Sequence, residues 1–176
     1  MKELLETWDI YDKNRKKTGK IAVRDKYQFK EGEYHIVVTA IILNSKNELL
    51  MSKRAGHKKY PLMWECTGGS ILEGETSLEG IIREVKEELG IQFQKGDAKF
   101  LKEIRRDKIP SDFKDLWLFK KDIDINQLIF LDGEVVDAKW VTIDEFKELI
   151  KENKIIPTID FNTEDYEKLL SYNNVE

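Results

Sequence analysis

The 176-residue sequence contains one cysteine and two histidines, and it has no long run of apolar residues. Cys66 alone cannot form an internal disulfide, which fits a reducing compartment. A nucleophilic role for Cys66 lacks support from His35 and His57, so we expect a small residue near the core. No stretch approaches transmembrane length, and acidic residues stand where a signal peptide would be apolar. We therefore expect a cytoplasmic protein with no membrane partner.

The charge and length favour one compact domain. The formal net charge of −4 gives no general attraction to nucleic acid or to a membrane surface. A hydrophobic content of 40% over this length is enough for a single domain, residues 1–176, with a sizeable core. We expect an N-terminal β-hairpin extension over about residues 1–30, in which Lys13–Gly19 form a turn between strands at Glu3–Asp12 and Lys20–Asp25. The sequence leaves monomer and homodimer open.

The order of the expected elements predicts an α+β fold. Apolar runs predict strands at His35–Leu43, Glu48–Arg54, Ala98–Arg106, Phe113–Lys121 and Val135–Val141. Helices are predicted over Ser77–Leu89, after a capping box at Thr142–Glu145, and over Thr163–Tyr172. Strands with segregated helices imply a mixed β-sheet between helices, an α/β/α sandwich.

The helix predicted over Ser77–Leu89 has clear signals at both ends. Thr76 and Glu79 form a capping box at its start, and Gly90 is a natural left-handed stop. An apolar stripe predicts the face that packs on the core. A second face gathers three carboxylates: Glu84, Glu87 and Glu88.

These carboxylates predict a metal site. At spacings of three and four they repel one another by roughly 0.2–0.5 kcal/mol per pair on an exposed helix, so they need a counter-cation. Hard oxygen ligands on one rigid face suit Mg²⁺ or Mn²⁺. Gly80 lies beside them in the helix and would leave room for ions and phosphate oxygens. Arg83 is expected to point away from the carboxylate face, toward Glu79 or Glu75.

Residues 69–91 as a whole resemble the Nudix box, G-x5-E-x7-R-E-U-x-E-E-x-G-U, in which U is apolar. The matching positions are Gly69, Glu75, Arg83, Glu84, Val85, Glu87, Glu88, Gly90 and Ile91. A charge run by itself usually marks a solvated helix face, but here the glycines, the arginine and the earlier glutamate are all in register. The resemblance implies the Nudix fold and a Mg²⁺- or Mn²⁺-dependent hydrolase. Such an enzyme cleaves the diphosphate linkage in a nucleoside diphosphate joined to another group, by water attack at phosphorus.

The resemblance also implies roles for single residues. The metal ligands would be Glu84, Glu87, Glu88 and the backbone carbonyl of Gly68, and the same three glutamates would be the catalytic residues. An ion pair between Arg83 and Glu75 would hold loop against helix. Together with Gly69 and Gly90, this pair makes up the structural part of the box.

The attacking water needs a proton acceptor, which in the family is a carboxylate of the box or of a later loop. Glu84 or Glu87 is the first choice, and Asp115 and Glu134 are the later candidates. Glu134 is also a candidate to complete the metal shell. The expected partner is a small-molecule diphosphate derived from a nucleotide.

Outside the box, the chain resembles the Nudix subgroup nearest to isopentenyl-diphosphate isomerase. The similar segments are Trp8–Asp12, Thr18–Gly19, Tyr34–His35, Asn47–Leu50, Lys53–Arg54, Trp64 and Trp140–Val141. An isomerase is therefore the rival function, but its Cys-Gly-His segment is missing after Trp64, and two histidines cannot supply its metal site. A non-catalytic nucleotide-sensing domain is a second alternative, although such a domain would be expected to lose box carboxylates. Removal of diphosphate from an RNA 5′ end is also open.

Three residues are candidates for contact with substrate. Arg54 can bind phosphate through paired hydrogen bonds. His35 is either a hydrogen-bonded core residue or a substrate contact, and Trp64 either packs in the core or stacks on a base.

Overall fold

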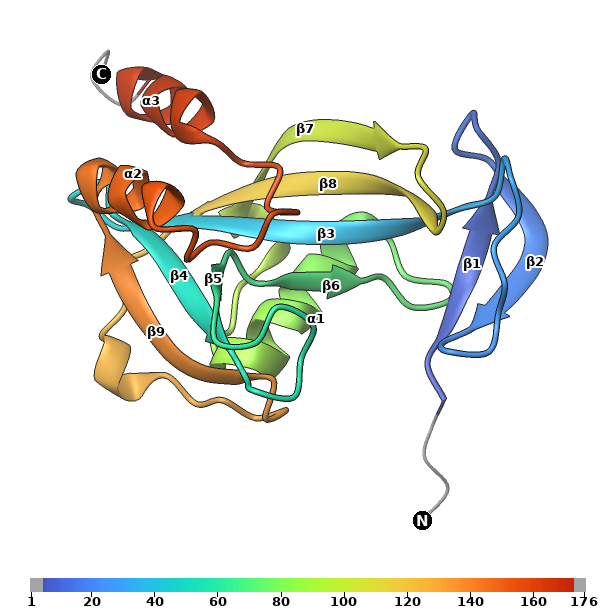
Figure 1. The fold of residues 1–176 in the computed structure, drawn as a ribbon, viewed down its shortest axis with the longest axis horizontal. Coiled ribbons are helices and arrows are strands. Elements are labelled where there is room, and N and C mark those ends of the chain that lie inside the picture. Colours follow the sequence, from blue (N-terminus) through green and yellow to red (C-terminus); the bar gives the residue numbers. More distant parts are fainter. Residues whose placement is uncertain (1–4, 173–176) are drawn as a thin grey trace. The chain divides into compact units, whose positions relative to one another are not determined.

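The computed structural model describes residues 5–172, which form three α-helices and nine β-strands (Figure 1). Several of the strand pairs are antiparallel, and one isolated parallel bridge joins Trp64 to Ile155, so the pairing is mixed. The predicted α+β class is confirmed. No helix in this described part is long and apolar enough to cross a membrane. Contacts within the chain define two compact units.

The described part of the first unit comprises residues 5–40, 68–85 and 92–118. Its strands are β1 (Thr7–Tyr11), β2 (Lys17–Val23), most of β3 (Tyr34–Leu43), β6 (Gly68–Ser70), β7 (Ala98–Arg106) and most of β8 (Ser111–Lys120). β1 pairs antiparallel with β2 and with β3, β6 pairs with β3, and β7 pairs with β8. The unit also contains the first nine residues of helix α1 (Ser77–Leu89).

The β1–β2 turn is shorter than the sequence predicts. Asp12 starts it, because its side chain accepts hydrogen bonds from the backbone N–H groups of Asn14 and Lys16, and Arg15 adopts a φ of 59°. The prediction that Gly19 belongs to the turn is wrong, since β2 already begins at Lys17. The pairing register shifts between Asp9 and Tyr11, and Gly19, at a φ of 80°, lies in the stretch of β2 that this irregularity spans.

The described part of the second unit comprises residues 41–67, 86–91 and 119–172. Its strands are the end of β3, β4 (Leu49–Arg54), β5 (Trp64–Glu65) and β9 (Val135–Val141). β4 pairs antiparallel with β3 at its start, with β5 at its end and with β9 along its whole length. The short strands β5 and β6 were not predicted, because neither is long enough to show a period.

Helices α2 (Ile143–Lys151) and α3 (Thr163–Tyr172) share an aromatic core in the second unit. Phe146, Phe161 and Tyr166 pack with ring centroids 5.7–6.0 Å apart. The hydroxyl of Tyr166 donates to the backbone carbonyls of Asn47 and Val141, which ties α3 to the strands. Burial raises the pKa of this phenol well above its ordinary value.

Helix α1 has the limits that its caps predict. The hydroxyl of Thr76 accepts from the backbone N–H of Glu79, and the carboxylate of Glu79 accepts from the N–H of Thr76. Gly90 follows the last turn with a φ of 71°. On the apolar side of the helix, Ile81 and Val85 are fully buried. The hydrogen bond from Lys95 and those from Thr76 lower the pKa of Glu79 to about 2.

Candidate functional site

The carboxylates of α1 differ sharply in exposure. Glu88 is 3% exposed, the Glu84 side chain is 14% exposed, and Glu87 lies on the surface. Ser77–Val85 belong to the first unit and Lys86–Leu89 to the second. Glu84 therefore belongs to the first unit, and Glu87 and Glu88 belong to the second.

In the first unit, Arg83 holds the preceding loop against the helix. Its guanidinium donates to both oxygens of Glu75, at 2.7 and 3.0 Å, and to the backbone carbonyl of Ser70 at 3.0 Å. The expected Arg83–Glu75 pair is therefore present. The prediction that Arg83 points away from the carboxylate face is wrong, because Nη1 also donates to Oε1 of Glu84 at 2.9 Å. Glu84 is thus held in place through the same arginine.

The charge of Arg83 is secured by these contacts. Burial alone would lower the pKa of its guanidinium, but the hydrogen bonds and charges of Glu75 and Glu84 outweigh burial and raise it. Arg83 stays protonated throughout the physiological range. The loop, the helix and Glu84 are accordingly fixed by a permanent cation.

The glycines at the start of the box admit close contacts that a side chain would block. A Cβ on Gly69 would lie 2.4–2.6 Å from the carboxylate atoms of Glu84, and a Cβ on Gly68 would lie 2.0 Å from the carbonyl oxygen of Val38. In the antiparallel β6–β3 pair, Gly69 stands opposite Val38 and Gly68 opposite Thr39. The strand therefore lies tightly on β3, and the carboxylate of Glu84 rests over its glycine backbone.

Gly80 has a different role from the one predicted. A Cβ at this position would lie 2.5 Å from Cγ2 of Ile71, and Gly80 is buried. The space beside Gly80 is filled by an apolar side chain of the core, so it is not room for ions or phosphate oxygens. The expectation for Gly80 is corrected accordingly.

In the second unit, a segment after β8 runs along the end of α1. The backbone N–H groups of Ile129 and Leu131 donate to the carbonyls of Leu89 and Glu87, in the last turn of the helix. A Cβ on Gly90 would lie 3.0 Å from Ile129, so this glycine also permits the close approach. The segment is thereby aligned with the box helix.

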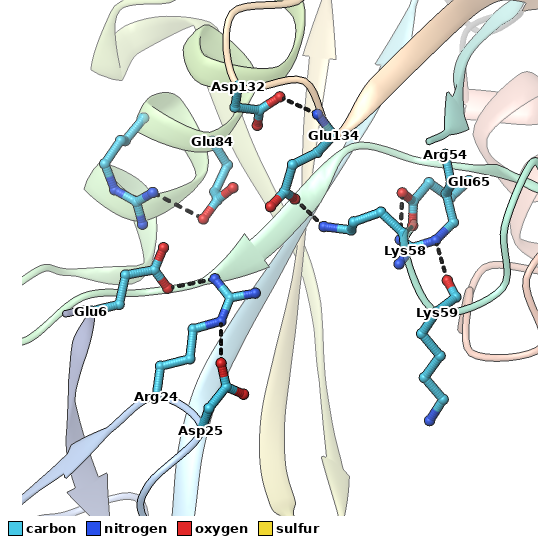
Figure 2. Close-up of polar contacts among 11 residues, drawn as sticks. Glu6, Arg24, Asp25, Arg54, Lys58, Lys59, Glu65, Glu84, Asp132 and Glu134 are labelled. Carbon is cyan, nitrogen blue, oxygen red and sulfur yellow. Dashed lines mark hydrogen bonds and ion pairs between the residues drawn. The ribbon is translucent and has the colours of Figure 1, made fainter. Parts of the chain in front are cut away.

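This alignment brings two more carboxylates to Glu88. One oxygen from each of Glu88, Asp132 and Glu134 lies within 4.8 Å of the others. The segment turns at Gly133, which has a φ of 73°, and the N–H of Glu134 donates to the Asp132 side chain at 2.9 Å (Figure 2). Sequence reasoning proposed Glu134 but missed Asp132. The Asp-Gly pair was the available signal, since it favours a tight turn that places flanking side chains together.

The chemistry of this donor set fits Mg²⁺ or Mn²⁺. All the donors are carboxylate oxygens, which these hard cations prefer, and no nitrogen or sulfur is needed. The residues that the structure describes contain no second cluster of three such ligands from histidine, cysteine, aspartate and glutamate.

The loop between β4 and β5 approaches Glu134 from the other side within the second unit. Lys58 forms an ion pair with the carboxylate of Glu134, as Figure 2 shows. Arg54, a candidate for binding phosphate, donates from Nη1 to both oxygens of Glu65 at 2.6 Å and from Nε to the carbonyl of Lys59 at 2.7 Å. Its side chain is only 14% exposed. These bonds give Arg54 a structural role in the loop.

The other two candidate substrate contacts are both buried. Trp64 is 8% exposed, and the ammonium groups of Lys53 and Lys139 lie 5.6 and 4.6 Å from its ring centroid. In the first unit, His35 is 7% exposed and stacks on Trp8 at 4.9 Å. Its Nδ1 lies 3.3 Å from the carbonyl oxygen of Ser111. These contacts agree with the packing interpretation of both residues.

Asp115, a later candidate for the proton acceptor, does not lie on a loop. It belongs to β8, its side chain is 1% exposed, and Arg15 donates to both of its oxygens at 2.7 and 2.5 Å. Its burial and its bidentate ion pair with Arg15 agree with a structural role for Asp115.

Comparison with known proteins identifies the relatives of this chain. Residues 33–159 match the family model for the NUDIX domain. An uncharacterised Nudix hydrolase of Listeria monocytogenes is 36% identical over 162 residues, which are 90% of this chain and 92% of that protein. A crystal structure of a Deinococcus radiodurans protein covers 85% of this chain and 91% of its own, with a TM-score of 0.66 and 21% identity. The structure of a NUDIX hydrolase from Nitrosomonas europaea covers 77% and 89%, with a TM-score of 0.60 and 20% identity.

Proposed function

Because this chain belongs to the Nudix family and is a Nudix hydrolase, we propose that it cleaves the diphosphate linkage in a nucleoside diphosphate joined to another group. The proposed reaction is water attack at phosphorus, and it depends on Mg²⁺ or Mn²⁺. The observation that carries this proposal is the gathering of Asp132 and Glu134 around Glu88, a buried carboxylate of the box helix. A buried carboxylate with two further carboxylates beside it is costly unless a cation compensates it.

The proposed ligands come from the box and from the segment beside it. Glu84, Glu87 and Glu88 of α1 and the carbonyl of Gly68 would hold the metal, and Glu134 would complete the set. Asp132 joins them as a ligand that only the structure indicates. When bound, the ion would neutralise charge on the diphosphate and favour ionisation of water.

The residues of the chain itself supply position and a proton acceptor. Arg83 fixes Glu84 over the glycine backbone of β6, which holds that carboxylate at one place. Glu87 is exposed at the end of the helix and can reach solvent water. One of these two glutamates is proposed to accept the proton of the attacking water.

We also propose that the whole chain is one hydrolase domain with the β1–β2 hairpin as an N-terminal extension. The family match at residues 33–159 includes segments of both units and begins after the hairpin, which supports this division. The cytoplasmic location stays a prediction of the sequence.

Replacement of single carboxylates tests the proposal. Glu88→Gln and Glu84→Gln should each lower turnover of a cleavable diphosphate by roughly a hundredfold or more, because a carboxylate of the site is lost while size is kept. The matched control is Glu148→Gln on α2, whose side chain is 64% exposed. Release of phosphate or nucleoside monophosphate from a panel of dinucleotides, nucleotide sugars and nucleoside triphosphates measures the effect. Unchanged turnover in folded Glu88→Gln would discard the site, and ligand-induced thermal shifts without turnover would favour a sensor.

A further inference from the structure

Lys58 occupies an unusual place for a lysine of a surface loop. Its ammonium forms an ion pair with Glu134, one of the three clustered carboxylates of the second unit (Figure 2). The Lys58 side chain is 19% exposed and that of Glu134 is 31% exposed. A monovalent cation of the chain thus lies where the proposed function places a divalent one.

The loop keeps Lys58 near Glu134 whether or not this ion pair is formed. The N–H of Ala55 donates to the backbone carbonyl of Glu134 at 2.8 Å, and the N–H of Lys58 donates back to the carbonyl of Ala55 at 3.2 Å. The backbone at position 58 is therefore tied to Glu134 through Ala55. The flexible side chain of Lys58 can still change its rotamer, so its ammonium group can move from one partner to another.

The far side of the loop is fixed by Arg54. Its backbone pairs with Leu62 and Met63, and its guanidinium bonds Glu65 and the carbonyl of Lys59. Tyr60 and Leu62 both adopt positive φ angles, 56° and 58°, which persist only where surrounding contacts impose them. Arg54 thus holds the loop in shape, and Lys58 is the cation that the loop presents to the cluster.

We propose that Lys58 is a positioning residue that exchanges partners during binding. Before a divalent cation binds, Lys58 neutralises Glu134; once the cation has taken that carboxylate, Lys58 turns to a phosphate oxygen of the substrate. This inference rests on the proposed function. Partly exposed ion pairs are weak, so a divalent cation can replace the ammonium at small cost. Mg²⁺ and Mn²⁺ complete their shells with substrate phosphates, which brings phosphate oxygens within reach of the displaced lysine.

Binding of Mn²⁺ alone, without substrate, tests the first half of the exchange. In Lys58→Met the competitor of the metal is gone, so the dissociation constant for Mn²⁺ should fall roughly fivefold, the fold-change that corresponds to a partly exposed ion pair. Titration followed by electron paramagnetic resonance of free Mn²⁺ measures it. Lys59→Met, which removes the same charge from the neighbouring position, is the matched control and should bind Mn²⁺ as the wild type does.

A double-mutant cycle assigns the effect to Glu134. In the Glu134→Gln background, Lys58 and Mn²⁺ no longer compete for a carboxylate at position 134. Adding Lys58→Met should therefore leave the affinity for Mn²⁺ unchanged. If Lys58→Met tightens Mn²⁺ binding equally in both backgrounds, the cause is a general change of field and the exchange is overturned.

Steady-state kinetics at saturating Mn²⁺ test the second half. Lys58→Met should raise KM for the diphosphate substrate roughly tenfold, the loss expected for a charge-assisted hydrogen bond, and Lys58→Arg should recover most of it. An unchanged KM overturns the phosphate contact.

Failure of this inference differs from failure of the proposed function. If the wild type binds Mn²⁺ and loses that binding in Glu88→Gln, the metal site stands, and an unchanged dissociation constant in Lys58→Met then overturns only the exchange. If the wild type binds no Mn²⁺, the metal site of the proposed function has failed, and the exchange fails with it.

Discussion

At the scale of single residues, the carboxylate of Glu84 occupies the space that the Cβ atom of any other residue at position 69 would need. The carboxylate atoms lie 2.4–2.6 Å from an ideal Cβ on Gly69, while Arg83 bonds the same carboxylate. Gly69, Arg83 and Glu84 of the box therefore act together. The backbone of Gly69 leaves space for the carboxylate of Glu84, and the guanidinium of Arg83 holds it there.

Gly69→Ala should therefore impair activity more than stability. The added methyl displaces the flexible end of Glu84, and a shift of about 1 Å in a catalytic group can cost roughly a hundredfold in turnover. Gly96→Ala is the matched control, because a Cβ there has no atom within 4 Å. Turnover and thermal melting measured together check the prediction. Full turnover in Gly69→Ala would show that Glu84 need not lie where it does.

His35 predicts a pH dependence of stability. Burial lowers the pKa of its imidazole, against the opposing effects of the Asp112 charge and the Ser111 carbonyl. The unfolded chain therefore takes up this proton first as the pH falls below about 6.5, so the free energy of unfolding decreases from there down to the lowered pKa of the folded state. Above about pH 6.5 both states are neutral, and the effect is absent.

His35→Gln should remove this part of the pH dependence. Urea unfolding at pH 7.5 and pH 5.5 measures the difference for each protein. His57→Gln, at the other and exposed histidine, should keep the wild-type difference. If His35→Gln loses as much stability between the two pH values as the wild type, His35 is not the titrating group.

At the scale of elements, the tip of the β1–β2 hairpin is attached to β8 by one ion pair. Arg15 donates to both oxygens of Asp115, whose side chain is 1% exposed, and it also pairs with Glu103. These bonds raise the pKa of the guanidinium, although burial opposes the rise. The positive charge of Arg15 thus holds the hairpin to the sheet of the first unit, and it also compensates the buried carboxylate of Asp115.

Arg15→Met should destabilise the protein by about 3 kcal/mol, because it leaves the carboxylate of Asp115 buried without its cation. Adding Asp115→Asn should restore part of the loss, since the buried charge is then gone. Lys13→Met, which removes an exposed charge from the same turn, is the control. Denaturant unfolding gives the three values. A loss below about 0.5 kcal/mol in Arg15→Met would show that water reaches Asp115.

The elements also show how far the sequence could predict the structure. The starts of α1 and α2 follow from capping boxes, in which residues three apart bond each other, so local sequence decides them. The β1–β2 turn was misplaced because its length depends on the pairing register of two strands. Asp132 was missed for a similar reason. It reaches Glu88 only because Ile129 and Leu131 bond the last carbonyls of α1, a contact between segments some 40 positions apart.

At the scale of the whole molecule, the fold carries clustered carboxylates at a cost that a bound cation would remove. The box helix contributes one buried member, Glu88, and the segment before β9 contributes Asp132 and Glu134. The unfolded chain does not assemble these ligands, so a divalent cation binds the folded state selectively and stabilises it by mass action.

Mn²⁺ should accordingly raise the midpoint of thermal unfolding in a concentration-dependent way. At about 100 times its dissociation constant the expected gain is about 2.7 kcal/mol, and excess chelator should abolish it. Glu88→Gln should melt at a similar or higher temperature than the wild type without metal, since one repelling charge is gone, and should respond far less to Mn²⁺. Calorimetry over a series of Mn²⁺ concentrations checks both statements. A metal site that loses one of its carboxylates cannot keep its full affinity for Mn²⁺. Equal responses of the wild type and Glu88→Gln would therefore mean that the stabilising ion binds elsewhere.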